Sequence, residues 1–493
     1  MSTASPYCLP SPDGRLVATL LASTINIREI QTLHTVKDVS LPRDFSGTVT
    51  SFQWSPSSRL VLVAAANEIH VFSACDGDDE FSAAIKNPAP PAASLVCVTF
   101  GALDTDVCVC ASLGLMFAIY NLASSSVVEV ANPKFHTAAS VRKGFCFRPR
   151  TRHLAVLTRT SGKDVISFHH PETKELQRSW CPDTLDAQGV VWSPDGKWLV
   201  AWESAAHGHK VLFYTPDGNL FKAWSGPQVL ESADADIKLG AGTKLLGFSA
   251  DARSLAIGDS SRRVCILDMT AVTERARLQH PKTIVPTGTL QLWQEHVGPD
   301  SHQFIRALQA VDPPIPQHKT SGPSPSGCAL LSFDASSTLL ATRLEDSPST
   351  VWIWDVAAAE LRAVLLFHRA VLRVLWHPVI RETLLIACDD DACNSPVFLW
   401  DPLSEGPKPV DLSGRLSNGK LYATWLDLNH NKPGALFISD SKGYLLASLA
   451  DQETESVPWC AEGELSDELD TTQDFDAHDE ASPLDDTFCF KKR

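Results

Sequence analysis

A short pattern of hydrophobic and polar positions recurs nine times along the first 450 residues of this chain. Each copy consists of an apolar run that ends in an aromatic residue or Pro, then a polar turn, then a second apolar run. The clearest copies read Trp54-Ser-Pro-Ser-Ser-Arg-Leu-Val-Leu-Val and Trp192-Ser-Pro-Asp-Gly-Lys-Trp-Leu-Val, and two similar copies begin at Phe248 and Phe333. Looser copies begin at Pro10, Phe100, Phe147, Trp376 and Trp425.

The anchor residues of successive copies are 44, 46, 47, 45, 56, 85, 43 and 49 residues apart. A repeat of about 40–45 residues built from four short strands is typical of a blade of a WD-type β-propeller. The pattern therefore predicts an all-β, closed or nearly closed propeller of about nine blades over residues 1–450. Seven blades followed by a partial second propeller is the alternative. Because propellers mostly present surfaces, a binding platform is the expected class of function.

The four strands of one blade can be followed between residues 189 and 224. Gly189–Trp192 forms the first strand, and the Ser-Pro-Asp-Gly turn after it suits a tight hairpin, since Pro fixes φ and Asp-Gly tolerates positive φ. Trp198–Trp202, Lys210–Tyr214 and Asn219–Trp224 follow as the second, third and outer fourth strands. Short apolar runs bounded by turn signals indicate strands that are buried on both faces.

One interval departs from the regular spacing, because the segment between Phe248 and Phe333 holds about 40 residues more than the usual period. We assign the surplus to an irregular insertion at residues 275–327. Its end, from Asp312 to Gly327, is rich in Pro, Ser and Gly and is typical of a loop. Its middle, Thr287–Gln294, is apolar enough for one more strand. The segment is therefore either a strand-bearing insertion, which we favour, or an eroded tenth blade.

The acidic charge is concentrated at the C-terminal end of the chain. The net charge is −16, and residues 451–493 contribute −11 of it, with 14 acidic and three basic residues. This tail has no strand period and few apolar residues, a composition typical of disorder. It is either a solubilising extension or a docking segment for a basic partner, since Leu465, Phe475 and Phe488 interleave with the charges. An acidic chain also repels phosphate backbones, which predicts no direct binding of nucleic acid.

The cysteines and the N-terminus indicate the compartment. Several cysteines, among them Cys97, Cys108 and Cys265, lie inside expected strands, and no Cys-x-x-Cys pair occurs. The N-terminus lacks the layout of a secretion signal, and no run of about 18 apolar residues is present that would span a membrane. We therefore expect reduced cysteines in a soluble intracellular chain that does not associate with membranes.

Two Trp-Asp dipeptides, Trp354-Asp355 and Trp400-Asp401, end expected third strands. In repeats of this type the Trp packs between blades and the Asp ends the strand near a tight turn, so a structural role is expected. The Gly-His pair that usually completes such repeats is missing, which indicates a divergent member. The residues singled out as structural repeat positions are Trp54, Trp192, Phe248, Phe333, Trp354, Asp355, Trp376, Trp400, Asp401 and Trp425.

Motifs for catalysis and for cofactor binding are missing from the sequence. There is no Gly-x-x-x-x-Gly-Lys-Ser/Thr loop for phosphates and no Gly-x-Ser-x-Gly elbow. The stretch Gly240–Gly247 runs into a strand, so it lacks the helix N-terminus that a dinucleotide loop needs. His207 with His209, and His169 with His170, have no Cys or carboxylate set nearby for a zinc site. We predict no catalytic residue, no metal site and no cofactor.

Beyond the generic repeat, several stretches of the chain resemble one protein family. The resemblance is carried by Ser11-Pro-Asp-Gly-Arg-Leu-Val-Ala, Ile27-Arg-Glu-Ile-Gln-Thr-Leu33, Val191-Trp-Ser-Pro-Asp-Gly, Leu199-Val-Ala-Trp, Lys210-Val-Leu-Phe-Tyr-Thr-Pro-Asp-Gly-Asn-Leu220, His280-Pro281, Leu340-Ala-Thr-Arg343 and Val351-Trp-Ile-Trp-Asp-Val356. Their order and spacing resemble the WD repeat-containing protein eight family, the WRAP-type centrosomal WD proteins. The resemblance covers roughly residues 8–450 and leaves the acidic tail outside.

This resemblance implies a non-catalytic scaffold at microtubule-organising centres, which are the centrosome in animals and the spindle pole body in fungi. Family members bind a coiled-coil pole-anchoring protein of the Msd/SSX-interacting type. Together they help to hold microtubule minus ends and the γ-tubulin complex at the pole, in fungi with a kinesin-fourteen. The resemblance also implies a cytoplasmic, cytoskeletal location and a role in organising the mitotic spindle.

Other functions stay open beside this one. Large divergent WD propellers also occur in translation initiation, where they bind the ribosome. An enzyme that uses the central channel would need carboxylates or a His–carboxylate constellation contributed by several blades. The remaining alternative is an unassigned adaptor of protein complexes.

The N-terminus departs from the family pattern. Only ten residues precede Ser11, whereas family members usually carry a further strand there and often have Phe at the position of Pro10. Because a propeller closes by pairing its two termini, either another strand closes the ring or the first blade is imperfect. A mispredicted gene start is a third explanation.

Overall fold

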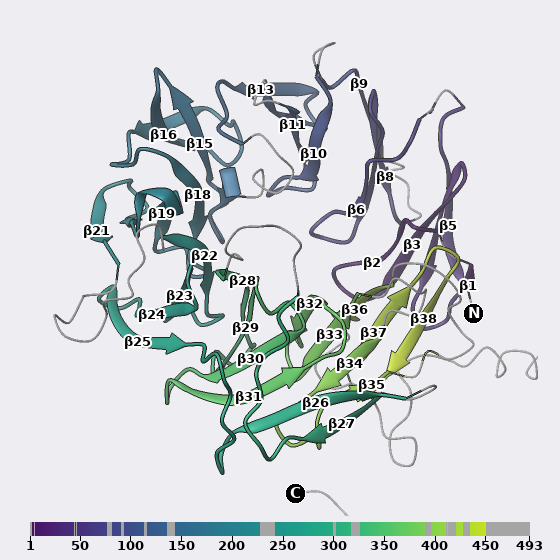
Figure 1. The fold of residues 1–493 in the computed structure, drawn as a ribbon. Coiled ribbons are helices and arrows are strands. Elements are labelled where there is room, and N and C mark those ends of the chain that lie inside the picture. Colours follow the sequence, from purple (N-terminus) through teal and green to yellow (C-terminus); the bar gives the residue numbers. More distant parts are fainter. Residues whose placement is uncertain are drawn as a thin grey trace, which may run out of the picture.

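Nine β-sheets follow one another around a ring in the computed structural model of this chain (Figure 1). The ring confirms the all-β propeller of nine blades, and it excludes seven blades with a partial second propeller. The acidic tail expected at residues 451–493 lies outside the described residues. The structure describes residues 2–3, 5–43, 45, 47–75, 81–89, 93–112, 116–135, 143–226, 242–298, 302–316, 326–389, 396–410, 412, 421–426 and 434–449.

Seven of the nine blades consist of four consecutive strands that pair in chain order, and the seventh and ninth blades recruit strands from elsewhere. The first three blades are β2 (Cys8–Pro10), β3 (Leu16–Leu21), β4 (Thr24–Glu29) and β5 (Thr35–Ser40); β6 (Ser51–Trp54), β7 (Leu60–Ala64), β8 (Glu68–Ser73) and β9 (Ser82–Lys86); and β10 (Leu95–Phe100), β11 (Asp106–Ala111), β12 (Phe117–Asn121) and β13 (Ser126–Val130). The next three are β14 (Phe145–Phe147), β15 (Leu154–Thr160), β16 (Lys163–His169) and β17 (Leu176–Trp180); β18 (Ala187–Trp192), β19 (Leu199–Glu203), β20 (Val211–Tyr214) and β21 (Leu220–Trp224); and β22 (Thr243–Phe248), β23 (Ser254–Asp259), β24 (Arg263–Asp268) and β25 (Thr273–Gln279). The seventh blade contains β28 (Cys328–Phe333), β29 (Leu339–Leu344), β30 (Thr350–Asp355) and β31 (Glu360–Leu366), with β26 (Gln291–Val297) and β27 (His302–Arg306) added. The eighth contains β32 (Val371–Trp376), β33 (Leu384–Cys388), β34 (Val397–Trp400) and β35 (Lys408–Pro409), and the ninth contains β36 (Tyr422–Leu426), β37 (Ala435–Ser439), β38 (Gly443–Ser448) and β1 (Ser2–Thr3). A short 3₁₀ helix, η2 (Ala205–His207), lies between β19 and β20.

The order of the strands in a blade follows their distance from the centre of the ring. First strands of neighbouring blades contact one another, as β6 contacts β10 and β28 contacts β32, so they surround the centre (Figure 1). Second strands are covered on both faces, and every residue of β7 and of β11 is buried. Fourth strands are largely exposed, as in β17. Continuous apolar runs mark strands that are buried on both faces, which is why these runs located the strands in the sequence.

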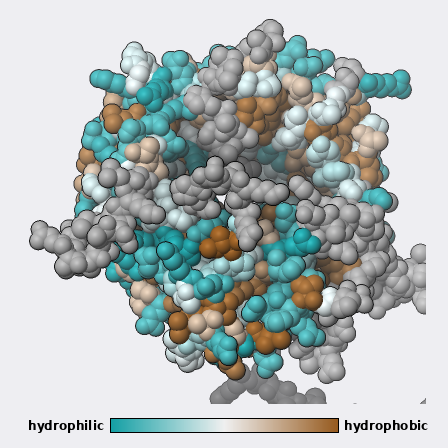
Figure 2. All heavy atoms as spheres, in the orientation of Figure 1, coloured by the Kyte–Doolittle hydropathy of each residue, from teal (hydrophilic) through white to brown (hydrophobic). Residues whose placement is uncertain are grey.

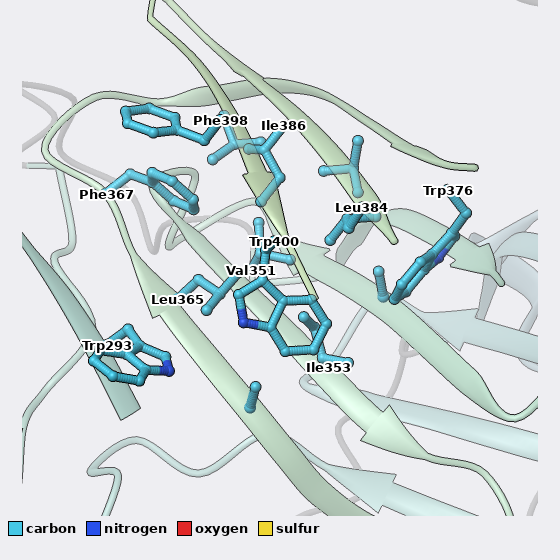
Figure 3. Close-up of a cluster of buried hydrophobic side chains, with 14 of the residues drawn as sticks. Trp293, Val351, Ile353, Leu365, Phe367, Trp376, Leu384, Ile386, Phe398 and Trp400 are labelled. Atoms are coloured by element: carbon cyan, nitrogen blue, oxygen red, sulfur yellow. The ribbon is translucent and has the colours of Figure 1, made fainter. Parts of the chain in front are cut away.

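Nine hydrophobic clusters fill the nine junctions between neighbouring blades. The cluster between the seventh and eighth blades is rich in aromatic residues (Figure 3). Trp376 lies at one side of it and Trp293, from β26, at the other, with Trp400 between them. Each blade therefore contributes one face to each of two clusters, and the core is continuous only around a complete ring.

The ring is closed by the N-terminal strand β1. It pairs antiparallel with β38, with Ser2 opposite Tyr444 and Thr3 opposite Gly443, and it supplies the fourth strand of the ninth blade. The first blade has four strands of its own, and Pro10 ends its first strand. The structure therefore selects the explanation in which another strand, ahead of the first Ser-Pro-Asp-Gly turn, closes the ring.

The insertion begins later than the expected residue 275. Residues 275–279 continue β25, which pairs with β24 through Arg263 opposite Gln279, because their alternating pattern suits an outer strand. The surplus chain forms a hairpin, β26–β27, in place of a tenth blade. β26 lies parallel to β31, with Gln291 opposite Ala363, so the hairpin extends the seventh blade outwards (Figure 1). The strand expected at residues 287–294 is displaced to 291–297, because Gly288 and its neighbours connect the blades.

The turn between the first and second strands keeps one geometry in blades with different sequences. In the fifth blade the Ser193 hydroxyl donates to the Asp195 carboxylate at 2.6 Å, and Gly196 has a φ of 69°, where glycine is favoured. Ser58 and Ala252 occupy the same place in other blades with φ values of 65° and 60°. A residue with a Cβ in the positive-φ region costs on the order of 1 kcal/mol. Because Ser58 and Ala252 adopt it, the packing of the surrounding blade stabilises the turn even where glycine is missing.

Removal of residues 2–4 is expected to lower the stability of the ring. The deletion removes the pairing with β38 and brings Pro6, which has no N–H, towards that edge, with a loss of about 1 kcal/mol for each backbone hydrogen bond. The midpoint of urea unfolding, followed by tryptophan fluorescence, measures the change. Replacement of Ser2 and Thr3 by Val keeps the backbone pairing and serves as the control. An unchanged midpoint in the deletion variant would show that β1 does not close the ring.

Candidate partner-binding surface

The residues singled out from the sequence occupy equivalent places in the blades. Trp54, Trp192, Phe248, Phe333 and Trp376 are the last residues of their first strands, and Trp425 lies one residue before the end of β36. Trp354 and Asp355 end the third strand β30, and Trp400 ends the third strand β34, directly before Asp401. These residues are distributed around the whole ring, so they form no common site.

Three of the tryptophans at the ends of first strands connect neighbouring blades by hydrogen bonds. The indole N–H of Trp54 donates to the carbonyl of Leu9 at 3.0 Å, and that of Trp425 donates to Leu375 at 3.0 Å. Trp376 donates to Ser332 at 2.9 Å. In each case the acceptor precedes the anchor residue of the previous blade, so the same hydrogen bond recurs at three junctions.

The two Trp-Asp dipeptides have the local roles that their sequence indicated. The Asp355 carboxylate accepts from the N–H groups of Ala357 and Ala358, at 2.9 and 2.8 Å. The Asp401 carboxylate accepts from the N–H of Leu403 at 2.8 Å. Both aspartates thereby stabilise the turn that follows a third strand.

A buried histidine that directly follows β25 of the sixth blade was not recognised as part of the repeat. The indole N–H of Trp354 donates to the Thr342 hydroxyl at 2.9 Å, and this hydroxyl lies 2.8 Å from Nε2 of His280. Nδ1 of His280 lies 2.9 Å from the carbonyl of Arg262 and must donate to it, so Nε2 accepts from Thr342. His280 thereby connects the sixth blade to Thr342 of the seventh, and the inserted chain separates it from β28 in the sequence.

The histidine pairs lie apart from any metal-binding set. No group of three or more His, Cys, Asp or Glu suited to a metal occurs within the described ranges. His169 is buried at the end of β16, and burial lowers its pKa. His209 contacts the Asp259 carboxylate at 3.4 Å. The nine first strands contain no Asp, Glu or His.

Exposed aliphatic side chains gather on the inserted segment. Among the residues that the structure describes, five of the fourteen exposed large hydrophobic residues lie in it, and Leu403 of the eighth blade lies beside it. Leu308 is 84% exposed and Leu403 is 95% exposed. Figure 2 shows hydrophobic residues on the rim where Figure 1 places β26 and β27. We call the group formed by Val297, Ile305, Arg306, Leu308 and Leu403 the hairpin surface.

The hairpin is held rigidly against the seventh and eighth blades. The side chain of Glu295 is 2% exposed, and its oxygens contact Nδ1 of His302 at 2.5 Å and the backbone N–H of His368 at 2.7 Å. Phe304 packs edge-to-face on Phe367 and Phe398, each with ring centroids 5.5 Å apart. The hairpin is therefore attached to the two blades through Glu295 on β26 and Phe304 on β27.

Two pockets open beside the hairpin, one on each face. The first has a volume of about 400 Å³ and lies between Trp293, Phe304 and the loop that contains Leu403. The second has a volume of about 420 Å³ and is lined by Ile305 and Leu308 among others. Arg306 lines both pockets. The hairpin surface therefore combines exposed apolar side chains, a cation and one depression on each face of the hairpin, which are features of protein-binding sites.

The sequence indicated an insertion, but it did not indicate this surface. Its second strand, β27, has only two neighbouring apolar residues, Phe304 and Ile305, and no strand period. Leu403 follows a Trp-Asp dipeptide nearly 100 residues further along the chain, and only the fold brings it beside the hairpin. The pair of apolar residues within a polar insertion was the available signal.

The chain is similar to two WD-repeat proteins. It is 25% identical over 420 residues to WD repeat-containing protein WRAP73 of Mus musculus, a match that covers 80% of this chain and 84% of that protein. It is 23% identical over 356 residues to an uncharacterized WD repeat-containing protein of Schizosaccharomyces pombe, which covers 69% and 70% of the two chains. No family model matches the chain.

The fold is also similar to that of a solved structure. The crystal structure of the eukaryotic initiation factor superposes with a TM-score of 0.51 and 11% identity, and covers 81% of this chain and 86% of that chain. At this identity the likeness shows the fold alone. No helix in the part of the chain that the structure describes is long and apolar enough to cross a membrane.

The stability of the ring is expected to fall between about pH 6.5 and pH 4 because of His280. Burial lowers the pKa of His280 from 6.5 to about 4, so the unfolded chain binds a proton in this range before the folded chain does. This contribution is complete above pH 6.5 and is lost as the pH falls towards 4. Urea unfolding at several pH values measures it. A His280→Gln variant is expected to show a shallower decline, and an equal decline would contradict the assignment.

Loss of one indole hydrogen bond between blades is expected to lower stability by about 1 kcal/mol. Trp376→Phe removes the donor to the Ser332 carbonyl and keeps an aromatic ring in the cluster. Chemical denaturation measures the free energy of unfolding. Trp198→Phe is the matched control, because the half-buried Trp198 packs at a tilt on Phe221 without an indole hydrogen bond in the described chain. Equal losses in both variants would argue against the interblade role.

Proposed function

Because the two matches support a WRAP-type WD-repeat family for this chain, we propose that the protein is a non-catalytic interaction scaffold of the centrosome or spindle pole body. The observation that carries the proposal is the 25% identity to WRAP73 over 420 residues. In this proposal the propeller helps a coiled-coil protein of the Msd/SSX-interacting type to anchor microtubule minus ends. The γ-tubulin complex and a kinesin-fourteen are further proposed partners, and organisation of the mitotic spindle is the outcome.

The geometry of the ring supports a scaffold. Two-sided burial makes the blades a stiff frame, and the variable parts of the chain are left on the outside. The hairpin surface presents aliphatic side chains and Arg306 on a strand that Glu295 and Phe304 hold in place. Rigid elements that carry an apolar patch and an exposed Arg bind proteins with a small loss of conformational entropy.

Purification of the tagged full-length chain from dividing cells of its own source, followed by mass spectrometry, tests this function. We expect recovery of a coiled-coil pole-anchoring protein together with γ-tubulin or a minus-end kinesin. We expect the tagged chain to be found at the pole by fluorescence microscopy. Recovery of ribosomal proteins without pole components would reject the proposal and favour a role in translation initiation.

A surface variant shows whether the hairpin surface takes part. Leu308→Asp with Leu403→Asp is expected to reduce recovery of the pole proteins at least about tenfold, since a charge is placed in each depression of the patch. Leu176→Asp, on the exposed strand β17 of the fourth blade, is the matched control and is expected to leave recovery unchanged. Equal recovery with both variants would place the partner elsewhere on the ring.

A further inference from the structure

We propose that β27 is an acceptor strand: an extended segment of a partner protein pairs with its free edge and directs alternate side chains into the two pockets. The inference deepens the proposed function and rests on it only for the existence of a protein partner. The partner segment is extended, carries aliphatic side chains on both of its faces, and has a carboxylate opposite Arg306.

The backbone of β27 offers hydrogen-bonding groups to such a segment. The N–H of Ala307 donates to the carbonyl of Leu292 at 2.8 Å, so Ala307 directs its backbone groups towards β26 in the antiparallel ladder. Because backbone groups alternate along a strand, Ile305 turns its N–H and C=O to β26, and His302, Phe304 and Arg306 turn theirs away. Within the described residues β26 is the one strand that pairs with β27, so these outward groups form an open edge.

The two pockets match the geometry of an added strand. Trp293 and Phe304 line the first pocket and face the eighth blade, whereas Gln294 and Ile305 line the second pocket on the opposite face. Successive side chains of a strand also point to opposite faces of a sheet. A strand added to β27 therefore places one side chain in the first pocket and its neighbour in the second, which is the usual mode of recognition by strand addition.

The edge is also less protected than two other outer edges of the ring, those of β25 and β35. β25 carries Glu274, Arg275 and Arg277 within seven residues, and β35 is two residues long and contains Pro409. Charges, short strands and Pro are the devices by which natural sheets avoid pairing with other chains. β27 is five residues long, and Arg306 is the residue in it that carries a permanent charge.

The charge of the site indicates the chemistry of the partner. Arg306 is exposed and forms no ion pair within the described part of the chain. Glu405 lines the first pocket beside it and is the one carboxylate among the residues of either pocket. A second copy of this chain is a poor occupant, because antiparallel pairing of two β27 strands about Phe304 places Arg306 opposite His302. An acidic, aliphatic segment of a different protein satisfies both the cation and the pockets.

The probe for the test is a phage-displayed library of random dodecapeptides, selected on the full-length chain. We expect enrichment of peptides with neighbouring aliphatic residues and an acidic residue, and we measure the affinity of the synthetic peptides by fluorescence anisotropy. Arg306→Pro removes the outward N–H and the cation, and keeps the hydrogen bonds to β26, because residue 306 faces away. It is expected to weaken binding at least about tenfold. Arg306→Lys keeps both groups and is the matched control, expected within about threefold of the original chain.

Hydrogen exchange on the unaltered chain tests the edge without a variant. The amides of His302, Phe304 and Arg306 are expected to exchange fast in the free protein and to slow when the peptide binds, whereas Ile305 is protected in both states. Peptides that bind equally well to Arg306→Pro, or that leave these amides unprotected, would overturn the inference. Concentration-dependent dimerisation that Arg306→Pro abolishes would also overturn it, in favour of a second copy. Recovery of pole proteins by an Arg306→Pro chain would reject the acceptor strand and leave the proposed function intact.

Discussion

Every blade of this ring buries apolar side chains on both of its faces, and neither face is covered unless both neighbouring blades are present. The hydrophobic cluster between the ninth and first blades contains Val17 and Ile30 from one end of the chain and Leu426 and Phe437 from the other. At about 25 cal/mol for each Å² of apolar surface, leaving one such junction open would expose several buried side chains at once. The stability of the ring therefore depends on its closure. The short strand β1 provides this closure by pairing with β38 where the two chain ends meet.

Two-sided burial also determines where the chain is free to vary. Inner strands and blade faces are packed, so extra residues are accommodated on the outer rim, where the added chain displaces no packed side chain. The hairpin β26–β27 follows this rule, since it extends the seventh blade outwards and contributes Trp293 and Phe304 to the cluster behind it. A surface built in this way is rigid at its base and exposed at its edge, which suits recognition of other proteins.

The buried polar groups serve the same packing. Burial lowers the pKa of His280, and in the neutral ring Nδ1 donates to the carbonyl of Arg262 while Nε2 accepts from the Thr342 hydroxyl. Trp54, Trp376 and Trp425 donate their indole N–H groups across a junction to the backbone of the previous blade. These three residues therefore join neighbouring blades.

The sequence by itself indicated about nine blades and the place of most strands, because anchors such as Trp54 and Trp192 and the apolar runs after them are local patterns with a regular period. It also indicated turns at Asp355 and Asp401, whose carboxylates accept hydrogen bonds from N–H groups within a few residues. Only the tertiary structure decided that Ser2 and Thr3 close the ring, that His280 joins Thr342, and that Leu403 lies beside Arg306. Those contacts join residues that are between about 60 and 440 positions apart, and no local pattern records which distant segments a closed ring brings together.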